Sequence, residues 1–375
     1  MELLRPAWAE INLKNIVHNY REVRRLVGPE VRIMAIVKAN AYGHGAVEVA
    51  NALGEAGADY FGVAVLSEAV QLREAGQKKP ILIIGWIPPE EYETALRYGI
   101  ALTIYSLEEA RILSRIALAK GQTAIVHLKI DTGMGRIGLP TDEEALEEVR
   151  QILELPGLNI EGIFTHLAKA DEKDKTFTNL QLERFRDFCQ RVEGRTGYRF
   201  PLKHMANSAA IIDCPTTYFD MVRAGIILYG LQPSAEVQLS RIDLRQAMSL
   251  RAKVSHVKKV PPGTSVSYGG TYVTGQEEVI ATVPVGYADG YSRLLSDKAR
   301  ILWQGHFAPV VGRICMDQFM FRATGLDVQK GDVVTLIGED GGGFLSVDEI
   351  AQILGTINYE VVCMISDRVP RVYQK

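Results

Sequence analysis

A lysine that directly follows a short apolar run is the first residue in this chain whose position suggests chemistry. Lys38 comes after the segment RIMAIV and is followed by the glycine-rich loop ANAYGHG at residues 39–45. A lysine at a strand end ordinarily extends its ammonium group to solvent. In a partly dry cavity its pKa falls, which suits Schiff-base chemistry. Tyr42, in the same loop, could donate a phenol hydrogen bond to a phosphate.

Polar groups follow several later apolar runs in the same way. Lys129 precedes the loop with Asp131 and Arg136, and His166 ends another run. Further candidates are Asn207, Ser208, Arg223, Gly225 and Ile226, which combine a hydroxyl with backbone N–H groups that could hold a phosphate. Each has an ordinary alternative: an ion pair for Lys129 and the arginines, a hydrogen-bonded core residue for His166. A phosphate site beside a strand-end lysine is what a pyridoxal phosphate enzyme needs.

These residues require a scaffold that brings strand ends together. Short β-branched runs occur at 31–37, 60–65, 81–86, 101–105, 124–130, 160–165, 202–205 and 221–224. Amphipathic, helix-favouring segments such as 67–76 and 106–121 lie between them, and Ser67 and Ser106 stand at the expected N-caps. This alternation predicts an α/β fold, a (β/α)₈ barrel of the TIM type over residues 12–240. Its active site would lie at the carboxyl ends of the strands.

The pattern changes after about residue 240. Segments such as RAKVSHVKKV, EEVIATVPVG and KGDVVTLIGE alternate or run apolar, with turn sequences between them and one clear helix at 347–354. We therefore predict a mainly β domain over residues 241–375, joined by residues 1–11.

Composition narrows the class of protein. The 375 residues carry 42 Lys+Arg and 45 Asp+Glu, a net charge of −3, which offers no footprint for nucleic acid or an anionic membrane. No apolar run approaches 18 residues, the first ten residues do not resemble a signal peptide, and the four cysteines are far apart. We expect a cytoplasmic protein with a small-molecule substrate. The histidines have no metal-binding spacing, so no metal is expected.

One motif points elsewhere. Gly133, Gly135 and Gly138 match the dinucleotide fingerprint G-x-G-x-x-G. The next helix start falls at residues 139–142, after the glycines, so they do not open a helix as that fingerprint requires. We therefore interpret this segment as a loop.

The stretch AIVKANAYGHG at 35–45 resembles the cofactor-lysine motif of bacterial alanine racemases. The similarity continues, in order, through HLKIDTGMGRIG, THLAKAD, ANSAA, VRAGIILYG, VSYGGTY, VPVGYADG, VGRICMDQ and TINYE. It covers essentially the whole chain. The resemblance implies an isomerase that interconverts L-alanine and D-alanine with pyridoxal 5'-phosphate and supplies D-alanine for the cell wall. It also implies a homodimer in which the β domain of one chain completes the barrel site of the other.

The resemblance also assigns roles to residues. Lys38 would hold the cofactor and act as one catalytic base, and Tyr268 would be the other. Arg223 would face the pyridine nitrogen, with His166 bridging Arg223 and Tyr268. Other cofactor-binding positions would be Tyr42, Asn207, Ser208, Gly225, Ile226 and Tyr359. Substrate contacts would come from Arg136, Tyr287, Met316 and Asp317, and Lys129 matches a position that is carbamylated in many members.

The chemistry agrees with these roles. Racemisation removes a proton from Cα and returns one to the opposite face, so a fixed substrate calls for two bases. Lysine and tyrosine have ordinary pKa values near about 10, so each must be activated by its surroundings. No cationic residue flanks Tyr268 in VSYGG, which leaves His166 and Arg223 as candidates. A racemase of broader range, a decarboxylase of similar architecture and a non-catalytic pyridoxal phosphate-binding protein are the alternatives.

Overall fold

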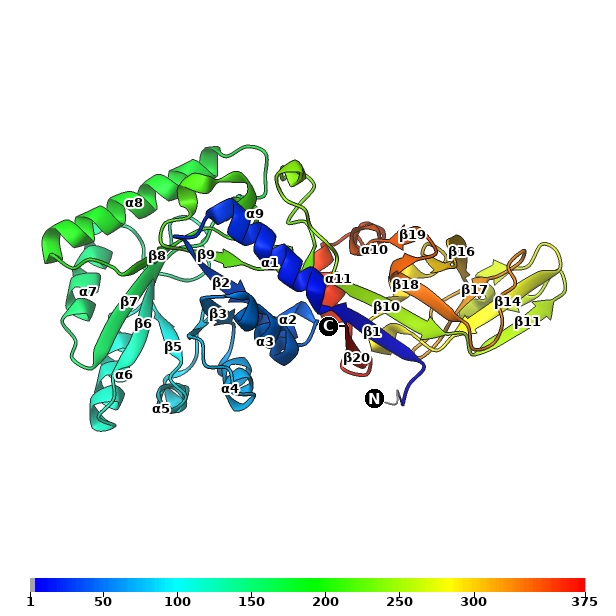
Figure 1. The fold of residues 1–375 in the computed structure, drawn as a ribbon, viewed down its shortest axis with the longest axis horizontal. Helices are drawn as coiled ribbons and strands as arrows, with labels where there is room; N and C mark the ends of the chain where they lie inside the picture. The colour runs from blue at the N-terminus through cyan, green and yellow to red at the C-terminus, as the bar shows by residue number, and fades with distance from the viewer. Residues whose placement is uncertain (1–3, 375) are drawn as a thin grey trace. The chain divides into compact units, whose positions relative to one another are not determined.

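The computed structural model describes residues 4–374, and Figure 1 traces their path. These residues form two compact units. One is Ile16–Ala41 with Ala46–Leu244, and the other joins the described parts of Met1–Asn15 and Arg245–Lys375 to Tyr42–Gly45. We call them the barrel unit and the β unit. The four residues of Tyr42–Gly45 therefore belong to the β unit, although their neighbours in sequence belong to the barrel unit.

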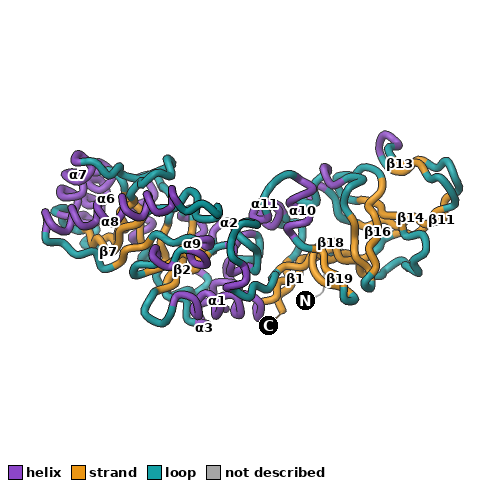
Figure 2. The backbone as a smooth tube through the Cα atoms, turned by 90° about the horizontal axis from the view of Figure 1, so that it is seen from above, coloured by secondary structure: helices purple, strands orange, loops and turns teal. Residues whose placement is uncertain are grey.

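Eight parallel strands close the barrel, as the sequence predicts. They are β2 (Arg32–Ile36), β3 (Tyr60–Val63), β4 (Ile81–Ile83), β5 (Ala101–Ile104), β6 (Ala124–Lys129), β7 (Leu158–Phe164), β8 (Leu202–His204) and β9 (Met221–Ala224). Pairing of β2 with β9 completes the circle, with Met34 opposite Arg223. Residues of these strands are mostly buried, since helices cover the outside (Figure 2).

The helices of this unit are α1 (Leu13–Val27), α3 (Ala46–Ala56), α4 (Leu66–Glu74), α5 (Tyr92–Arg97), α6 (Leu107–Ala119), α7 (Glu143–Leu153), α8 (Thr176–Thr196) and α9 (Ser208–Asp213). Helix α1 precedes the first barrel strand, and the other helices of this unit lie between or after the strands. Ser106 is the N-cap of α6, with its hydroxyl accepting from the backbone N–H of Glu109. The predicted cap at Ser67 is wrong. Helix α4 begins at Leu66, so its N-cap position is Val65, two residues before Ser67, and the carboxylate of Glu68 accepts hydrogen bonds from the backbone N–H groups of Ala64 and Val65.

The β unit is built around one large, mainly antiparallel sheet. Its strands lie in the order β11-β14-β17-β16-β15-β18-β10-β1-β20. The first strand, β1 (Ala7–Asn12), pairs with β10 (Met248–Lys253) and β20 (Arg371–Gln374). The others are β11 (His256–Val260), β14 (Glu278–Val283), β15 (Arg300–Trp303), β16 (His306–Val311), β17 (Phe319–Arg322), β18 (Val333–Asp340) and β19 (Gly343–Leu345), while β12 (Ser265–Val266) and β13 (Tyr272–Val273) form a separate hairpin.

Two helices accompany this sheet, where the sequence predicts one. Helix α10 (Val347–Leu354) has the predicted bounds, and Ser346 caps it. Helix α11 (Asn358–Met364) is the one the sequence analysis missed. Its N-cap is Ile357, whose side chain cannot cap a helix, and it spans only seven residues, so no start signal was present. None of the helices within residues 4–374 is long and apolar enough to span a bilayer.

Candidate active site

The chain turns in an unusual conformation directly after Lys38. Ala39, Asn40, Ala41 and Tyr42 all have positive φ, between 50° and 54°, and so form a left-handed turn, α2 (Lys38–Tyr42). This conformation costs about 1–2 kcal/mol for each residue other than glycine. Within the barrel unit, the Ala39 N–H donates to Glu68 at 2.6 Å, and the Ala46 N–H donates to Asn40 at 2.8 Å. A strained turn held by such contacts is typical of a functional site.

The next residues, Tyr42–Gly45, pack inside the β unit. The ring of Tyr42 lies 6.1 Å from that of Tyr359, centre to centre, so two predicted phosphate-binding residues come together. A Cβ atom on Gly43 would lie 2.3 Å from the carbonyl oxygen of Val362, and Arg371 donates to the Gly43 carbonyl at 3.0 Å. Burial raises the pKa of Tyr42 well above its usual range, so its phenol keeps the proton with which it can donate.

The predicted phosphate residues of the barrel also meet. The Ser208 hydroxyl accepts from the Gly225 N–H at 2.9 Å, and Ile226 is buried beside them at the start of a short helical turn. Asn207 caps α9, accepting from the Ala210 N–H at 3.1 Å, so its side chain orders this loop. Backbone N–H groups at two helical starts and a hydroxyl form a suitable environment for a phosphate.

Arg223, on β9, is the most heavily bonded side chain of the candidate site. Its guanidinium donates to the carbonyls of Thr165, His204 and Met205 at 2.7–3.1 Å. It also lies 3.1 Å from Nδ1 of His166 and 3.1 Å from Nδ1 of His204. Burial and the nearby Arg136 lower its pKa to about 9, which leaves it charged at neutral pH. No carboxylate is among these contacts, so the positive charge of the guanidinium is not neutralised by a neighbouring anion.

The two histidines beside Arg223 are neutral. Burial lowers the pKa of both His166 and His204 well below the usual range, and the charge of Arg223 lowers it further. An arginine can only donate, so each Nδ1 is the accepting nitrogen and each proton sits on Nε2. The predicted contact between His166 and Arg223 is therefore present. The predicted contact between His166 and Tyr268 stays a prediction.

Lys129, at the end of β6, is a buried amine that forms no salt bridge within residues 4–374, although the charge of Asp131 acts on it. Its ammonium group donates to the Ile130 carbonyl at 2.7 Å and lies 5.6 Å from the centre of the Phe164 ring. Asp131, a suggested partner, instead accepts from the backbone of the following loop at 2.9–3.1 Å. Burial, followed by the charges of Arg223 and Arg136, lowers the pKa of Lys129 to about 7. Arg136 is exposed on that same loop, which runs from Asp131 to Gly138.

Tyr268 lies at the tip of the β12–β13 hairpin in the β unit. Its side chain is 69% exposed, and its neighbours Ser267 and Gly269 both have positive φ, at 64° and 75°. Val266 anchors the hairpin in a small apolar core. A cation that the sequence analysis overlooked lies here: a Cβ atom on Gly269 would be 3.4 Å from the guanidinium carbon of Arg313, and Ser267 donates to the Arg313 carbonyl at 2.5 Å.

Tyr287 and Met316, two predicted substrate contacts, are neighbours in the β unit. The backbone N–H groups of Tyr287 and Ala288 donate to the carbonyls of Cys315 and Met316 at 3.0 and 3.1 Å. Both residues are exposed, at 42% and 52%, so neither belongs to the core of the β unit. A pocket of the β unit reaches Tyr287, lined also by Ala288, Gly290, Ser292, Arg293, Met364 and Ser366.

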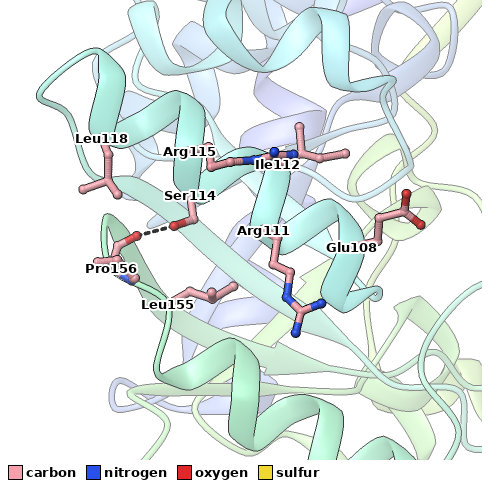
Figure 3. A pocket seen from close by; sticks show the side chains of 8 residues that line it. All are labelled: Glu108, Arg111, Ile112, Ser114, Arg115, Leu118, Leu155 and Pro156. Atoms are coloured by element: carbon pink, nitrogen blue, oxygen red, sulfur yellow. Dashed lines mark hydrogen bonds between the residues drawn. The ribbon is translucent and has the colours of Figure 1, made fainter.

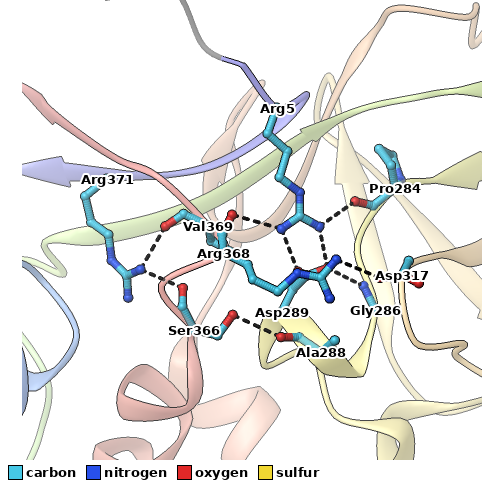
Figure 4. Close-up of polar contacts among 10 residues, drawn as sticks. All are labelled: Arg5, Pro284, Gly286, Ala288, Asp289, Asp317, Ser366, Arg368, Val369 and Arg371. Carbon is cyan, nitrogen blue, oxygen red and sulfur yellow. Dashed lines mark hydrogen bonds and ion pairs between the residues drawn. The ribbon is translucent and has the colours of Figure 1, made fainter.

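A buried carboxylate anchors this turn (Figure 4). Asp289 accepts two hydrogen bonds from Arg5, each 2.6 Å long, and one from the Gly286 N–H at 2.9 Å. Arg368 lies 3.5 Å from Asp289 and donates to Asp317 at 2.7 Å. Asp317, a predicted substrate contact, is therefore occupied by an ion pair at the surface.

A second pocket lies on the barrel unit, and none of the candidate residues lines it (Figure 3). It is lined by α6 and the segment after α7, namely Glu108, Arg111, Ile112, Ser114, Arg115, Leu118, Leu155 and Pro156. Ser114 donates to the Pro156 carbonyl across its floor at 2.6 Å.

Strand-end polar groups on a closed parallel barrel, with a separate, mainly antiparallel β unit, define a two-unit protein of the (β/α)₈-barrel class. The sequence matches the alanine racemase N-terminal domain over residues 11–233 and the alanine racemase C-terminal domain over residues 247–373. The chain belongs to the alanine racemase family.

Individual relatives are similar over their whole length. The alanine racemase of Desulforamulus reducens is 53% identical over 369 residues, which is 98% of this chain and 99% of the relative. Among solved structures, an alanine racemase from Clostridium difficile 630 is 45% identical with a TM-score of 0.96, covering 100% of this chain and 97% of that one. The alanine racemase of Bartonella henselae with covalently bound pyridoxal phosphate is 31% identical with a TM-score of 0.87, covering 98% and 99%.

Proposed function

We propose that this protein is an enzyme that interconverts L-alanine and D-alanine with pyridoxal 5'-phosphate as cofactor. The observation that carries the proposal is the 53% identity to an alanine racemase across 98% of the chain, which includes both units. The contacts around Arg223, Ser208 and the turn after Lys38 agree with it. D-alanine made in this way would serve cell-wall synthesis, and we propose a cytoplasmic location for this supply.

The residues present fit the cofactor. Ser208 and the backbone at Gly225 and Ile226 form a buried polar cradle in the barrel unit, and Tyr42 and Tyr359 lie together in the β unit. These groups would hold the phosphate, and Lys38 would bind the cofactor covalently. When bound, the cofactor withdraws electrons from the substrate and makes its Cα proton acidic enough to remove.

We propose that Lys38 and Tyr268 are the two bases, each moving a proton to and from one face of Cα. The strained backbone of Ser267 beside Tyr268 and the left-handed turn after Lys38 restrict where each base can reach, which favours positioned proton transfer. Arg136, Tyr287 and Met316 would orient the substrate, and Asp317 would act through Arg368, its ion-pair partner.

Arg223 would face the pyridine nitrogen of the cofactor. A fixed positive charge disfavours a second positive charge beside it, so this nitrogen would stay unprotonated. Arg223 meets only carbonyls and neutral imidazoles, so no nearby carboxylate offsets its charge. This environment favours return of the proton to Cα over transamination. A decarboxylase of similar architecture would need a carboxylate at that nitrogen.

We also propose that the protein works as a homodimer, with the β unit of one chain supplying Tyr268 to the barrel of its partner. Tyr268, Tyr287 and Met316 are exposed in the single chain, as expected for side chains that a partner covers. Mixing inactive Lys38→Ala and Tyr268→Phe proteins would restore part of the activity if each site draws on two chains. A mixture with no more activity than its components would reject the shared site.

The test of the function is a racemisation assay on a panel of amino acids, with and without added cofactor. We expect alanine to be racemised fastest and activity to depend on the cofactor. Lys38→Ala should abolish activity and the visible absorbance of the bound cofactor. Comparable rates on several amino acids would indicate a racemase of broader range. Cofactor binding without exchange of the Cα proton would indicate a non-catalytic binding protein.

A further inference from the structure

A chain of hydrogen-bonded polar side chains runs from Arg223 through the interior of the barrel unit to Glu161, whose side chain is 26% exposed. His204 presents Nδ1 to the Arg223 guanidinium at 3.1 Å and Nε2 to Nδ1 of His127 at 2.9 Å. Nε2 of His127 in turn lies 3.0 Å from the carboxylate of Glu161. Both histidines are fully buried. The chain therefore joins a residue of the candidate site to a carboxylate that the proposed mechanism does not use.

The positions of the protons on the two histidines follow from the groups at the two ends of this series, Arg223 and Glu161. Arginine only donates, so Nδ1 of His204 accepts and its proton sits on Nε2. That proton is donated to Nδ1 of His127, whose own proton must then sit on Nε2 and be donated to Glu161. Burial lowers the pKa of both histidines, and the hydrogen bond from His127 lowers the pKa of Glu161, so all three groups are in the states this order requires.

The backbone of β7 is adapted to this contact. The pairing of β6 with β7 shifts between Val126 and His127, so Glu161 is an extra residue between Ile160 and Gly162. Such a bulge redirects a side chain that regular alternation would place elsewhere. The ring of His127 then fills the space that a side chain at position 162 would take: a Cβ on Gly162 would lie 2.3 Å from its Nδ1.

We propose that Glu161 is a positioning residue for the racemisation: as the last acceptor of the chain it fixes the tautomers of His127 and His204 and thereby holds the Arg223 guanidinium in place. This inference rests on the proposed function, because Arg223 matters to the reaction only if the cofactor lies against it. Tyr60 donates to the same carboxylate at 2.8 Å from the side and is not part of the chain.

The role of Glu161 becomes clear when its removal is considered. Without the carboxylate, the Nε2 proton of His127 loses its hydrogen bond to Glu161. The other tautomer of His127, with its proton on Nδ1, then becomes available. His204 would then carry its proton on Nδ1, pointing at a guanidinium that also donates. Two donors facing each other at 3.1 Å would push Arg223 away from its contacts with Thr165 and Met205. With the carboxylate present, the reversed order instead leaves two acceptors facing each other at His127 and Glu161, so it is excluded.

The first measurement uses nitrogen NMR of the unaltered full-length protein labelled in its histidine rings, with and without pyridoxal phosphate. Protonated and bare ring nitrogens are widely separated in such spectra, so the tautomers are read directly. Resonances are assigned by their loss in His127→Gln and His204→Gln. We expect both residues to be neutral with the proton on Nε2. A proton on Nδ1 of His204, or a doubly protonated ring, would overturn the proposal without any variant at Glu161.

The second measurement compares Glu161→Leu, which removes the acceptor, with Glu161→Gln, whose amide oxygen can still accept from His127. We expect Glu161→Leu to mix the tautomers and to lower kcat by about tenfold to a hundredfold, with KM for alanine changed by less than about threefold. Glu161→Gln should restore the tautomer and most of kcat. Equal losses in both variants, or a loss in KM alone, would contradict a positioning role.

Tyr60→Phe is the matched control, because it removes a hydrogen bond to the same carboxylate but leaves its acceptor for His127 intact. We expect its tautomers and kcat to match those of the parent. The histidine spectra are also recorded on cofactor-free protein, so they test the hydrogen bonds from Arg223 to Glu161 even if the protein does not racemise alanine. Correct tautomers in a protein without racemase activity would reject the proposed function alone. Racemisation with unaltered kcat in Glu161→Leu would reject this inference alone.

Discussion

The guanidinium Nη2 of Arg223 lies 3.1 Å from Nδ1 of His166. An arginine next to a histidine forces the imidazole to accept, so His166 is neutral and keeps its proton on Nε2. It can therefore donate from that nitrogen to a group on its other side. Arg223, for its part, meets no negative charge in any of its hydrogen bonds. We propose that the chemistry of the candidate site depends on this positive charge.

Replacing Arg223 by glutamate should change which reaction the site favours. A carboxylate at this position would stabilise a protonated pyridine nitrogen, and transamination would gain relative to racemisation, by about tenfold or more. The measurement is the ratio of pyruvate formed to alanine racemised. Arg223→Lys, which keeps the charge, should leave that ratio close to the parent value. An unchanged ratio in Arg223→Glu would reject the proposed role.

Tyr268→Phe removes one proposed base while keeping the aromatic ring. Exchange of the Cα proton with deuterated water should fall by about a hundredfold or more from one enantiomer of alanine, and far less from the other. The reason is that Lys38 can still remove the proton from the face of Cα that it contacts. Mass spectrometry of each enantiomer over time gives both rates. Small, equal losses from the two enantiomers would be incompatible with the two-base scheme.

Lys129 should be carbamylated in the native protein. Its pKa of about 7 leaves much of the amine uncharged at neutral pH and able to attack carbon dioxide. The anionic product would sit among the positive charges of Arg223 and Arg136. Carbon-13 NMR after incubation with labelled bicarbonate should show a carbamate signal that is absent in Lys129→Ala. A fully active protein with an unmodified Lys129 would contradict the proposed carbamylation.

The same pKa shift predicts how stability depends on pH. Lys129 has its pKa lowered from 10.5 in the unfolded chain to about 7 in the folded protein, so the unfolded state binds more protons between these values. If Lys129 is unmodified, its contribution to the free energy of unfolding should rise from pH 7 to pH 10. Lys129→Met should flatten this rise in denaturation experiments. An identical pH dependence in both proteins would show that the lowered pKa is absent.

Gly43→Ala should destabilise the protein through one contact. The new Cβ would lie 2.3 Å from the Val362 carbonyl oxygen, so α11 or the loop must move. Gly28→Ala is a matched control, because Gly28 has nearly the same φ, 79° against 78°, but nothing within 4 Å of its Cβ position. We expect Gly43→Ala to lose about 2 kcal/mol more free energy of unfolding than Gly28→Ala. Equal losses would mean that only the positive φ matters.

Arg5→Ala should destabilise the protein, because it leaves the buried carboxylate of Asp289 without its main cationic partner. Asp289 is fully buried, and Arg5 gives it two of its hydrogen bonds. Removing the arginine should lower the free energy of unfolding by about 3 kcal/mol, since Arg368, at 3.5 Å, replaces it only in part. Arg5→Ala combined with Asp289→Ala should cost less than the sum of the two single changes. Strict additivity would contradict a direct coupling between these residues.

Much of the barrel could be predicted because its signals are local. Each strand is a short β-branched run, and caps such as Ser106 and Asp142 mark where helices begin. Helix α11 and the true start of α4 could not be predicted, because Ile357 and Val65 carry no capping signal. In those places no N-cap side chain marks the helix start, and at α4 the carboxylate of Glu68 accepts from the N–H groups of Ala64 and Val65, which precede the helix.

The sequence by itself determined the family, the two architectures and the residue types at the strand ends, because these depend on order and periodicity along the chain. Only the tertiary structure decided the left-handed turn after Lys38, the place of Arg313 near Tyr268, and the chain from Arg223 to Glu161. The physical reason is that the charge state, tautomer and strain of a group depend on neighbours distant in sequence. His127 and Glu161 are 34 positions apart, and their side chains meet where the pairing of β6 with β7 shifts register.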